Sequence, residues 1–236
     1  MSFSKKLFLI SFFVLIIIPY NASAANLALG AISQFGMSGA NTNSSKIFPS
    51  GFRDFDSGFA FSIGLNQPIS SSSKISFSLL LDLGYYHDSY DFKYTINGRR
   101  ATENYQFESF LVGGYARFNF GFISLGAGGG AKIPGSATYK LNSYDRNRFY
   151  RFNFGDLNDI FESVVIPYVR FSLDFTVFNY LLIGVYASYD FPLYFQYNNY
   201  INDVIINKDS ISALDIGIQF GYYINIDFDR DKYYYL

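Results

Sequence analysis

The only histidine of this 236-residue chain, His87, lies in the stretch YYHDSY, with Asp88 directly after it and Ser89 two positions on. A serine hydroxyl can attack a carbonyl carbon when a histidine takes its proton and a carboxylate orients that histidine. Ser89 and His87 would supply the first two of these groups. In an extended strand, neighbouring side chains point to opposite faces, so Asp88 would point away from both and the carboxylate has to come from elsewhere.

The residues before His87 alternate between apolar and polar with a period of two, which is typical of a strand with two different faces. The same alternation recurs along the chain, with large apolar residues on one face and small, glycine-rich or charged residues on the other. The eight segments that show it are 26–37, 57–66, 74–86, 105–119, 121–133, 165–178, 181–191 and 213–228. We therefore predict an all-β fold of eight strands.

A turn between the third and fourth of these strands determines which residue lies opposite His87. Asn97-Gly98 is the strongest short-range signal for a two-residue hairpin turn. Counting back from that turn places His87 opposite Glu108 and keeps the apolar residues of both strands on one face, an agreement that a slip by one residue would destroy. Ser89, His87 and Glu108 are therefore the candidate catalytic residues, on one outward face of this hairpin.

The first residues, MSFSKKLFLISFFVLIIIPYNASA, have the pattern of a secretory signal: two lysines, an apolar run at 7–18 and small residues at 22–24. The apolar run is shorter than a membrane-spanning helix requires. We predict a cleaved signal peptide at 1–24, a single structural unit at 25–228 and a short tail at 229–236.

The composition indicates a membrane environment. Aromatic residues, all Tyr or Phe, make up 21% of the chain and charged residues only 16%, and both values depart from those of an average soluble domain. The exported part has no apolar run long enough for a spanning helix. A closed β-barrel is the other structure that satisfies every backbone polar group in lipid, whereas a soluble lipocalin-like barrel would put its apolar face inside.

Charge and cysteine content exclude several classes of partner. The formal net charge of −1 gives no indication of a nucleic-acid partner. The chain has no cysteine, so disulfides and thiolate metal sites are excluded, and we expect no metal and no cofactor.

The connections between the predicted strands alternate in length, as they do in outer-membrane barrels. The connections around 68, 119–121 and 178–180 are short. The long connections, which would be extracellular loops able to bind a ligand, are 38–56, 87–104, 134–164 and 192–212. The sequence thus predicts an eight-stranded antiparallel transmembrane up-and-down β-barrel with four long extracellular loops, three short periplasmic turns and both termini in the periplasm.

The polar face of the strands would line the inside of this barrel. An eight-stranded barrel is just wide enough to be filled by side chains, and buried charges have to pair. The predicted polar network of the lumen is Asp82, Arg117, Lys132, Arg170, Asp174, Asp190 and Asp215. Gly126, Gly128 and Gly130 would make room for long side chains of other strands. We expect a structural plug of ion pairs, with a small conducting pore as the alternative.

The closing stretch QFGYYINI, with Gln219, Gly221, Ile224 and Ile226, resembles the C-terminal signal by which outer-membrane barrels are passed to the barrel-assembly machinery. It differs from the usual form in having Ile224 where an aromatic residue is common. The chain as a whole resembles small OmpX- and OmpA-like barrels. This resemblance implies the outer membrane of a Gram-negative-type bacterium, contact with outer-membrane lipid, assembly-machinery partners and a monomer.

Three functions remain open at this level. The leading one is a non-enzymatic surface protein with a structural role or with loops that bind or adhere. The rival is a lipid-modifying acyl hydrolase, because the spacing of His87 and Ser89 resembles that of outer-membrane lipid A deacylases. A histidine–glutamate pair at a membrane rim nevertheless needs no catalytic purpose. A small porin is the third.

The third long connection contains GDLNDIFESV, whose apolar residues have helical spacing. Asp156 could cap the start of this helix. We expect a lid over the barrel mouth, with a partner-binding helix as the alternative.

Overall fold

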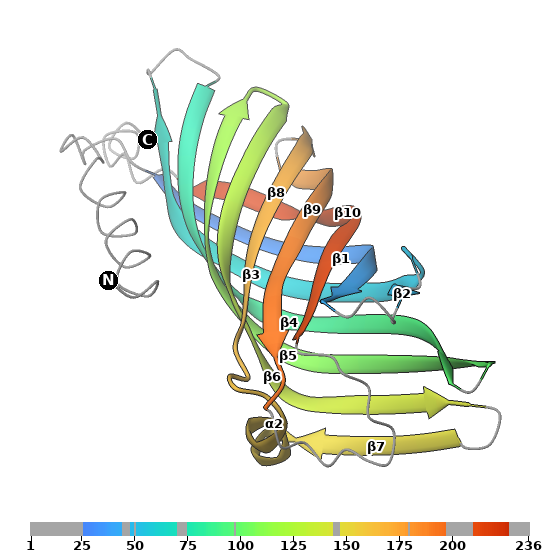
Figure 1. The fold of residues 1–236 in the computed structure, drawn as a ribbon. Coiled ribbons are helices and arrows are strands. Elements are labelled where there is room, and N and C mark those ends of the chain that lie inside the picture. The colour runs from blue at the N-terminus through green and yellow to red at the C-terminus, as the bar shows by residue number, and fades with distance from the viewer. Residues whose placement is uncertain are drawn as a thin grey trace, which may run out of the picture.

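The computed structural model describes residues 26–43, 48–49, 51–69, 75–96, 98–143, 147–178, 180–196 and 210–226, and nearly all of them are in strands (Figure 1). The strands are β1 (Asn26–Thr42), β2 (Phe48–Pro49), β3 (Asp54–Pro68), β4 (Ile75–Ile96), β5 (Arg99–Phe120), β6 (Ile123–Asn142), β7 (Asn147–Asn153), β8 (Ile166–Val177), β9 (Leu181–Tyr194) and β10 (Ser210–Ile226), and α2 is Phe154–Ile160. The predicted signal peptide 1–24 and tail 229–236 lie outside the described residues.

Eight of the strands form a closed ring in the order β1, β3, β4, β5, β6, β8, β9 and β10, and antiparallel pairing of β10 with β1 completes it. Closure removes the free edges of an open sheet. The two remaining strands lie outside the ring, β2 against β4 and β7 against β6. The predicted eight-stranded antiparallel barrel is therefore confirmed.

The register of the β4–β5 hairpin is the one that the sequence predicts. His87 lies opposite Glu108, and Tyr85 lies opposite Phe110. Gly98 in the turn has a φ of 79°, in the left-handed region that glycine adopts without strain. Asn97, the other predicted turn residue, lies outside the described residues.

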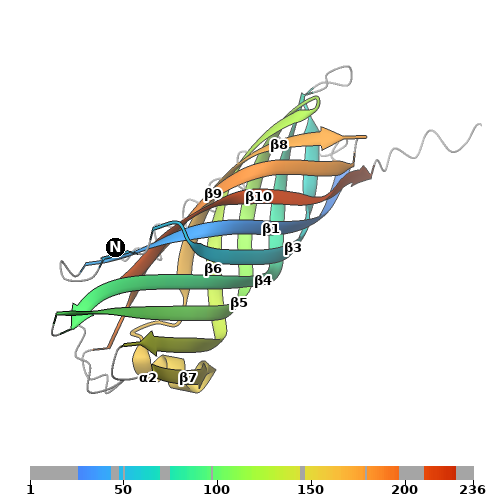
Figure 2. The ribbon, with the colours of Figure 1, turned by 90° about the vertical axis from the view of Figure 1, so that its right-hand side faces the viewer.

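The barrel extends further than predicted at the end opposite Asn26 and Ile226. Most of 87–104, predicted as a loop, continues β4 and β5, and 134–164 contains the end of β6 together with β7 and α2. We call the described residues of 87–108, 134–142 and 147–161 the distal extension; β4, β5, β6, β7 and α2 form this end in Figures 1 and 2.

The outside of the barrel below the distal extension is apolar. Outward side chains there are strongly exposed, for example Phe61 at 62% and Phe171 at 61%. A continuous band of this kind faces lipid in membrane barrels. We call the outward faces of 59–68, 75–85 and 110–120, with the matching parts of the other strands, the lipid-facing belt. Within the described ranges, no helix has the length and apolar character needed to cross a membrane.

The inside of the distal extension is an aromatic core closed by α2. Tyr90, Phe92, Tyr105 and Phe107 pack there with Leu157 of α2, and all five are buried. The core supports the interpretation of this helix as a lid.

The cap of α2 differs from the sequence prediction. Asn153 is the N-cap residue, and its side chain accepts a hydrogen bond from the backbone N–H of Asp156. Asp156 is the third helical residue and completes a capping box by accepting from the Asn153 backbone N–H.

Candidate functional site

The predicted catalytic residues share the outer wall of the barrel, directly beyond the lipid-facing belt. His87 Nδ1 lies 2.8 Å from Glu108 Oε1 across the β4–β5 ladder. Tyr85, the last belt residue of β4, donates its hydroxyl hydrogen to the other oxygen of Glu108. The structure therefore brings together the histidine and the carboxylate of the predicted triad.

Ser89 does not join this pair. Its hydroxyl accepts a hydrogen bond of 2.9 Å from the Asn104 side-chain amide, which also donates to Asp91 at 2.6 Å. In the part of the chain that the structure describes, no hydrogen bond links Ser89 to His87, and Ser89 is only 5% exposed. Residues two apart along a strand are separated by about 6–7 Å, which is why a serine and a histidine with this spacing need particular rotamers to touch.

The environment keeps His87 uncharged. Burial and the charge of Lys140 lower the pKa of His87, and burial raises the pKa of Glu108. A histidine with a lowered pKa is neutral at pH 7, so its contact with Glu108 is a hydrogen bond from Nδ1–H rather than a full ion pair. The other ring nitrogen is then the basic one.

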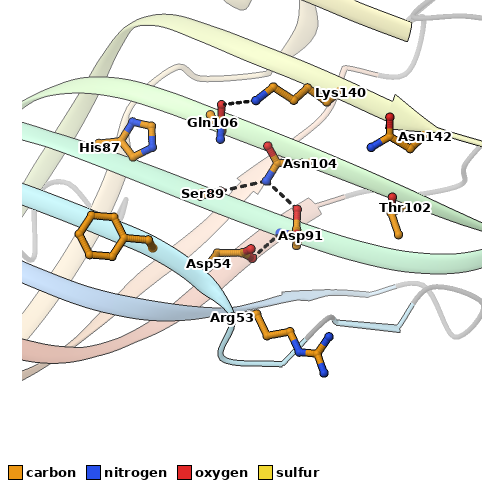
Figure 3. Close-up of a pocket in the computed structure, with 11 residues that line it drawn as sticks. Arg53, Asp54, His87, Ser89, Asp91, Thr102, Asn104, Gln106, Lys140 and Asn142 are labelled. Atoms are coloured by element: carbon orange, nitrogen blue, oxygen red, sulfur yellow. Dashed lines mark hydrogen bonds between the residues drawn. The ribbon is translucent and has the colours of Figure 1, made fainter. Parts of the chain in front are cut away.

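A groove of about 510 Å³ opens beside this pair on the outer wall (Figure 3). Its lining is mostly amide, hydroxyl and charged side chains from β4, β5 and β6 and from the start of β3. The lining residues are Arg53, Asp54, Phe55, His87, Ser89, Asp91, Thr102, Asn104, Gln106, Lys140 and Asn142. Such a surface can hydrogen-bond a polar ligand from several directions.

The groove exists because β3 separates from β4. Their ladder ends at the pair Ser57–His87. Beyond it, aspartate side chains take the place of backbone acceptors: Asp56 accepts from the Ser89 N–H at 2.7 Å and Asp54 from the Asp91 N–H at 2.9 Å. The sequence interpretation missed Arg53, Asp54 and Lys140 as site residues, because it assigned them to loops. The signal that could have found Arg53 and Asp54 is the charged run RDFD before the second predicted strand, 57–66.

All seven predicted lumen residues lie inside the barrel and are buried. Nearest the barrel end that holds Asn26 and Ile226, Arg117 lies 3.7 Å from Asp174, and its guanidinium stacks 4.6 Å above the Tyr223 ring. In the middle, Arg170 lies 2.5 Å from Asp82. The structure thus pairs each of these two arginines with one aspartate.

At the level of the distal extension, Lys132 contacts three carboxylates. Its Nζ lies 2.6 Å from Asp88, 2.8 Å from Asp190 and 3.6 Å from Asp215. The same ammonium lies 4.0 Å from the centre of the Tyr86 ring. Asp88 points inward, as expected from its position after His87, but its part in the lumen network was missed.

Charges therefore lie inside this ring of strands, and apolar side chains lie outside it. A soluble barrel has the reverse arrangement. The chain is an eight-stranded β-barrel of the outer-membrane type.

Comparison with known proteins gives solved structures of the same kind. No family model and no curated protein matches the chain. The barrel is similar to Ail, the attachment invasion locus protein of Yersinia pestis, in complex with the heparin analogue sucrose octasulfate (11% identity, 85% of this chain, 98% of that chain, TM-score 0.40). It is also similar to the outer membrane protease OmpT of Escherichia coli (11%, 86%, 96%, 0.38) and to Neisserial surface protein A (11%, 84%, 97%, 0.36). At these TM-scores the matches say nothing about activity.

The glycines predicted to make room in the barrel do so unequally. A Cβ at Gly126 or Gly128 would collide with Tyr115, whose ring crosses β6 at this point. A Cβ at Gly130 would instead meet the backbone of Val112. Gly126 therefore accommodates a side chain, and Gly130 permits close approach of two strands. Gly128 does both, because a Cβ there would also lie 2.5 Å from the Gly114 carbonyl oxygen.

The residues of the predicted assembly signal divide between the two faces of β10. Gln219 is buried and donates to Asp174, and Gly221 packs against the backbone of Ile32 on β1. Ile224 and Ile226 are exposed, at 45% and 36%. Their role in assembly stays a prediction.

Proposed function

We propose that the protein is an exported, non-enzymatic surface protein of the outer membrane of a Gram-negative-type bacterium, and that its distal extension lies outside the cell and binds a saccharide. The observation that carries this proposal is the polar groove on the outer wall, directly beyond the lipid-facing belt. Both termini would lie in the periplasm, after removal of residues 1–24. The exposed apolar belt supports the membrane location, because such a surface requires lipid around it.

The filled interior argues against transport through the barrel. Ion pairs around Arg117, Arg170 and Lys132 occupy three levels of the lumen, and the aromatic core with α2 closes the distal end. We expect the purified protein in planar bilayers to show no conductance. Stepwise single-channel currents would contradict the proposed plug.

The groove has the chemistry of a saccharide site. Lys140 offers hydrogen-bond donors to sugar hydroxyls or phosphates, and Asp91 offers an acceptor. Phe55, 58% exposed, adds an apolar surface against which a sugar ring can pack. The saccharide could be the headgroup of an outer-leaflet glycolipid or a free surface polysaccharide.

Binding experiments test this role. Protein in nanodiscs would be titrated with the oligosaccharide released from outer-leaflet glycolipid, and nanodiscs made with and without the glycolipid would show whether the lipid-borne headgroup competes. Asp91→Ala or Lys140→Ala should each weaken binding about tenfold, the effect of losing one good hydrogen bond to a charged group. Gln67→Ala, at the opposite end of the barrel, should leave the affinity unchanged. Absence of saturable binding, or equal loss in all three variants, would refute the role.

The 2.8 Å contact between His87 and Glu108 favours a second candidate, an acyl hydrolase that acts on outer-membrane lipid. Its nucleophile would be Ser89, which would have to leave Asn104 and turn toward His87. Mass spectrometry of outer-membrane lipids from cells with the wild-type protein and with Ser89→Ala tests this directly. An acyl chain lost in the first sample and kept in the second would establish the hydrolase activity. Identical lipids in both samples would exclude it.

A further inference from the structure

The interior cations of the barrel do not share the carboxylates evenly. Lys132 faces Asp88, Asp190 and Asp215. Asp56, also fully buried, lies close enough to interact electrostatically with Lys132 and Asp190. We call Asp56, Asp88, Asp190 and Asp215 the distal acidic cluster. With every group ionised, one ammonium among four carboxylates leaves three negative charges unmatched.

Several oxygens of this cluster have no hydrogen-bond partner among the described residues. Lys132 contacts one oxygen of Asp88 and one of Asp190, and the second oxygen of each is unpartnered. Neither oxygen of Asp215 is hydrogen-bonded. All three carboxylates are 0% exposed, and one oxygen from each lies within 4.8 Å of the other two. Because unsatisfied buried charges are strongly disfavoured, this level of the barrel has to gain positive charge besides that of Lys132, from bound protons or from a second cation.

We propose that the distal acidic cluster binds one Ca²⁺ ion, with Asp215 as its principal ligand and the second oxygens of Asp88 and Asp190 completing the protein donors. Every donor is a carboxylate oxygen, the ligand type that hard divalent cations prefer. Two positive charges reduce the unmatched charge from three to one.

The donor set favours calcium over magnesium. Mg²⁺ usually keeps several of its waters, whereas Ca²⁺ accepts irregular coordination by protein oxygens. Asp88 and Asp190 each supply one unpartnered oxygen and Asp215 supplies two, so four carboxylate oxygens are available to such an irregular shell.

The ion would join opposite walls of the barrel, because Asp88 is on β4 while Asp190 and Asp215 are on β9 and β10. The aromatic core lies directly beyond it: Tyr90 donates to Asp190 at 2.8 Å and packs against Phe107. A site closed in this way should exchange its ion slowly. Bound Ca²⁺ would therefore act as a structural staple of the barrel rather than as a rapid sensor.

The test uses the full-length folded protein in detergent. Elemental analysis after gel filtration without chelator should find one calcium per chain. After prolonged chelation, added Ca²⁺ should raise the thermal unfolding temperature, followed by circular dichroism, and Mg²⁺ should raise it less. Asp215→Asn should lose the bound calcium and the temperature shift. Asp174→Asn, an equally buried control at the other end of the lumen, should keep both.

Three results would overturn the proposal. The first is wild-type protein with no calcium and no response to it. The second is a calcium response that survives in Asp215→Asn, which would place binding on the surface. The third is chelated protein that reaches the full stability at acidic pH alone, which would show that protons neutralise the cluster. The calcium content of the wild-type protein decides the matter even if Asp215→Asn does not fold.

Discussion

Two regions of the barrel interior use the same residue types to opposite effect. Around Arg170 and Arg117, each cation has one carboxylate partner, Asp82 or Asp174, and stacks on a tyrosine ring. Around Lys132, one cation meets a cluster of carboxylates. A balanced pair carries no net charge, although Arg117 Nε and Nη2 and Arg170 Nε have no hydrogen-bond partner among the described residues. An unbalanced cluster has negative charge left over that can bind a cation. The ratio of cations to carboxylates therefore distinguishes the structural plug from the candidate ion-binding site, although both regions contain the same residue types.

Breaking a balanced pair should have the largest effect. Arg170→Met leaves Asp82 buried without its cation, and Arg170 also donates to Gln34. We expect a loss of about 3–5 kcal/mol in the free energy of unfolding, measured by urea titration in lipid vesicles. The double variant Arg170→Met with Asp82→Leu should recover most of this loss, because no unpaired charge remains. A single variant as stable as the wild type would show that the pair contributes nothing.

Replacing an aspartate by asparagine should change the free energy of unfolding in opposite directions in the two regions. Asp82→Asn removes the partner of Arg170 and should destabilise the barrel. Asp215→Asn, in the presence of chelator, removes one of the surplus negative charges of the distal acidic cluster and should stabilise the barrel. We expect on the order of 1–3 kcal/mol in each direction. The same urea titration applied to both variants checks this, and a loss of stability in both would contradict the charge surplus.

The barrel architecture could be predicted from the sequence because its two faces differ so strongly. The strand ends could not, because the apolar face changes sides. In the lipid-facing belt of β4 the apolar residues, such as Leu83, point outward; beyond His87 the apolar residues Tyr90 and Phe92 point inward, and Ser89 lines the outer groove. A search for one continuous alternation of apolar and polar residues ends each strand too early. It stops where the outer face passes from lipid into water and the inner face begins to line an apolar core.

The candidate sites could be predicted only where one strand pair defines them. The His87–Glu108 contact follows from the hairpin register alone. The bond between Asn104 and Ser89 depends on which rotamer a diagonal neighbour adopts, and a sequence pattern does not contain this. Likewise, the inward direction of Asp88 follows from its parity, but its contact with Lys132 crosses the barrel and requires the closed fold.

Asp54 is a third kind of carboxylate, because its partner is another carboxylate, Asp91, and not a cation. It lies outside the lipid-facing belt, and burial and the neighbouring Asp91 raise the pKa of Asp54 from 3.8 to about 7. A raised pKa in the folded state means that the folded chain holds this proton more tightly than the unfolded chain does. The stabilisation is therefore fully present below pH 3.8 and is lost as the pH rises through about 7.

The effect should be local, because Asp54, 7% exposed, bonds directly to the backbone N–H of Asp91. Its carboxyl carbon should titrate near neutral pH by NMR, and the Asp91 amide that bonds to it should exchange more slowly at pH 5.5 than at pH 8 after correction for intrinsic rates. Asp54→Asn should abolish the pH dependence of that protection, while the amides of the belt, such as that of Leu81, keep theirs. Titration of Asp54 near pH 4 would mean that water reaches its carboxylate more freely than the groove geometry indicates. The difference between paired and unpaired carboxylates would then hold for the lumen but not for the outer wall of the barrel.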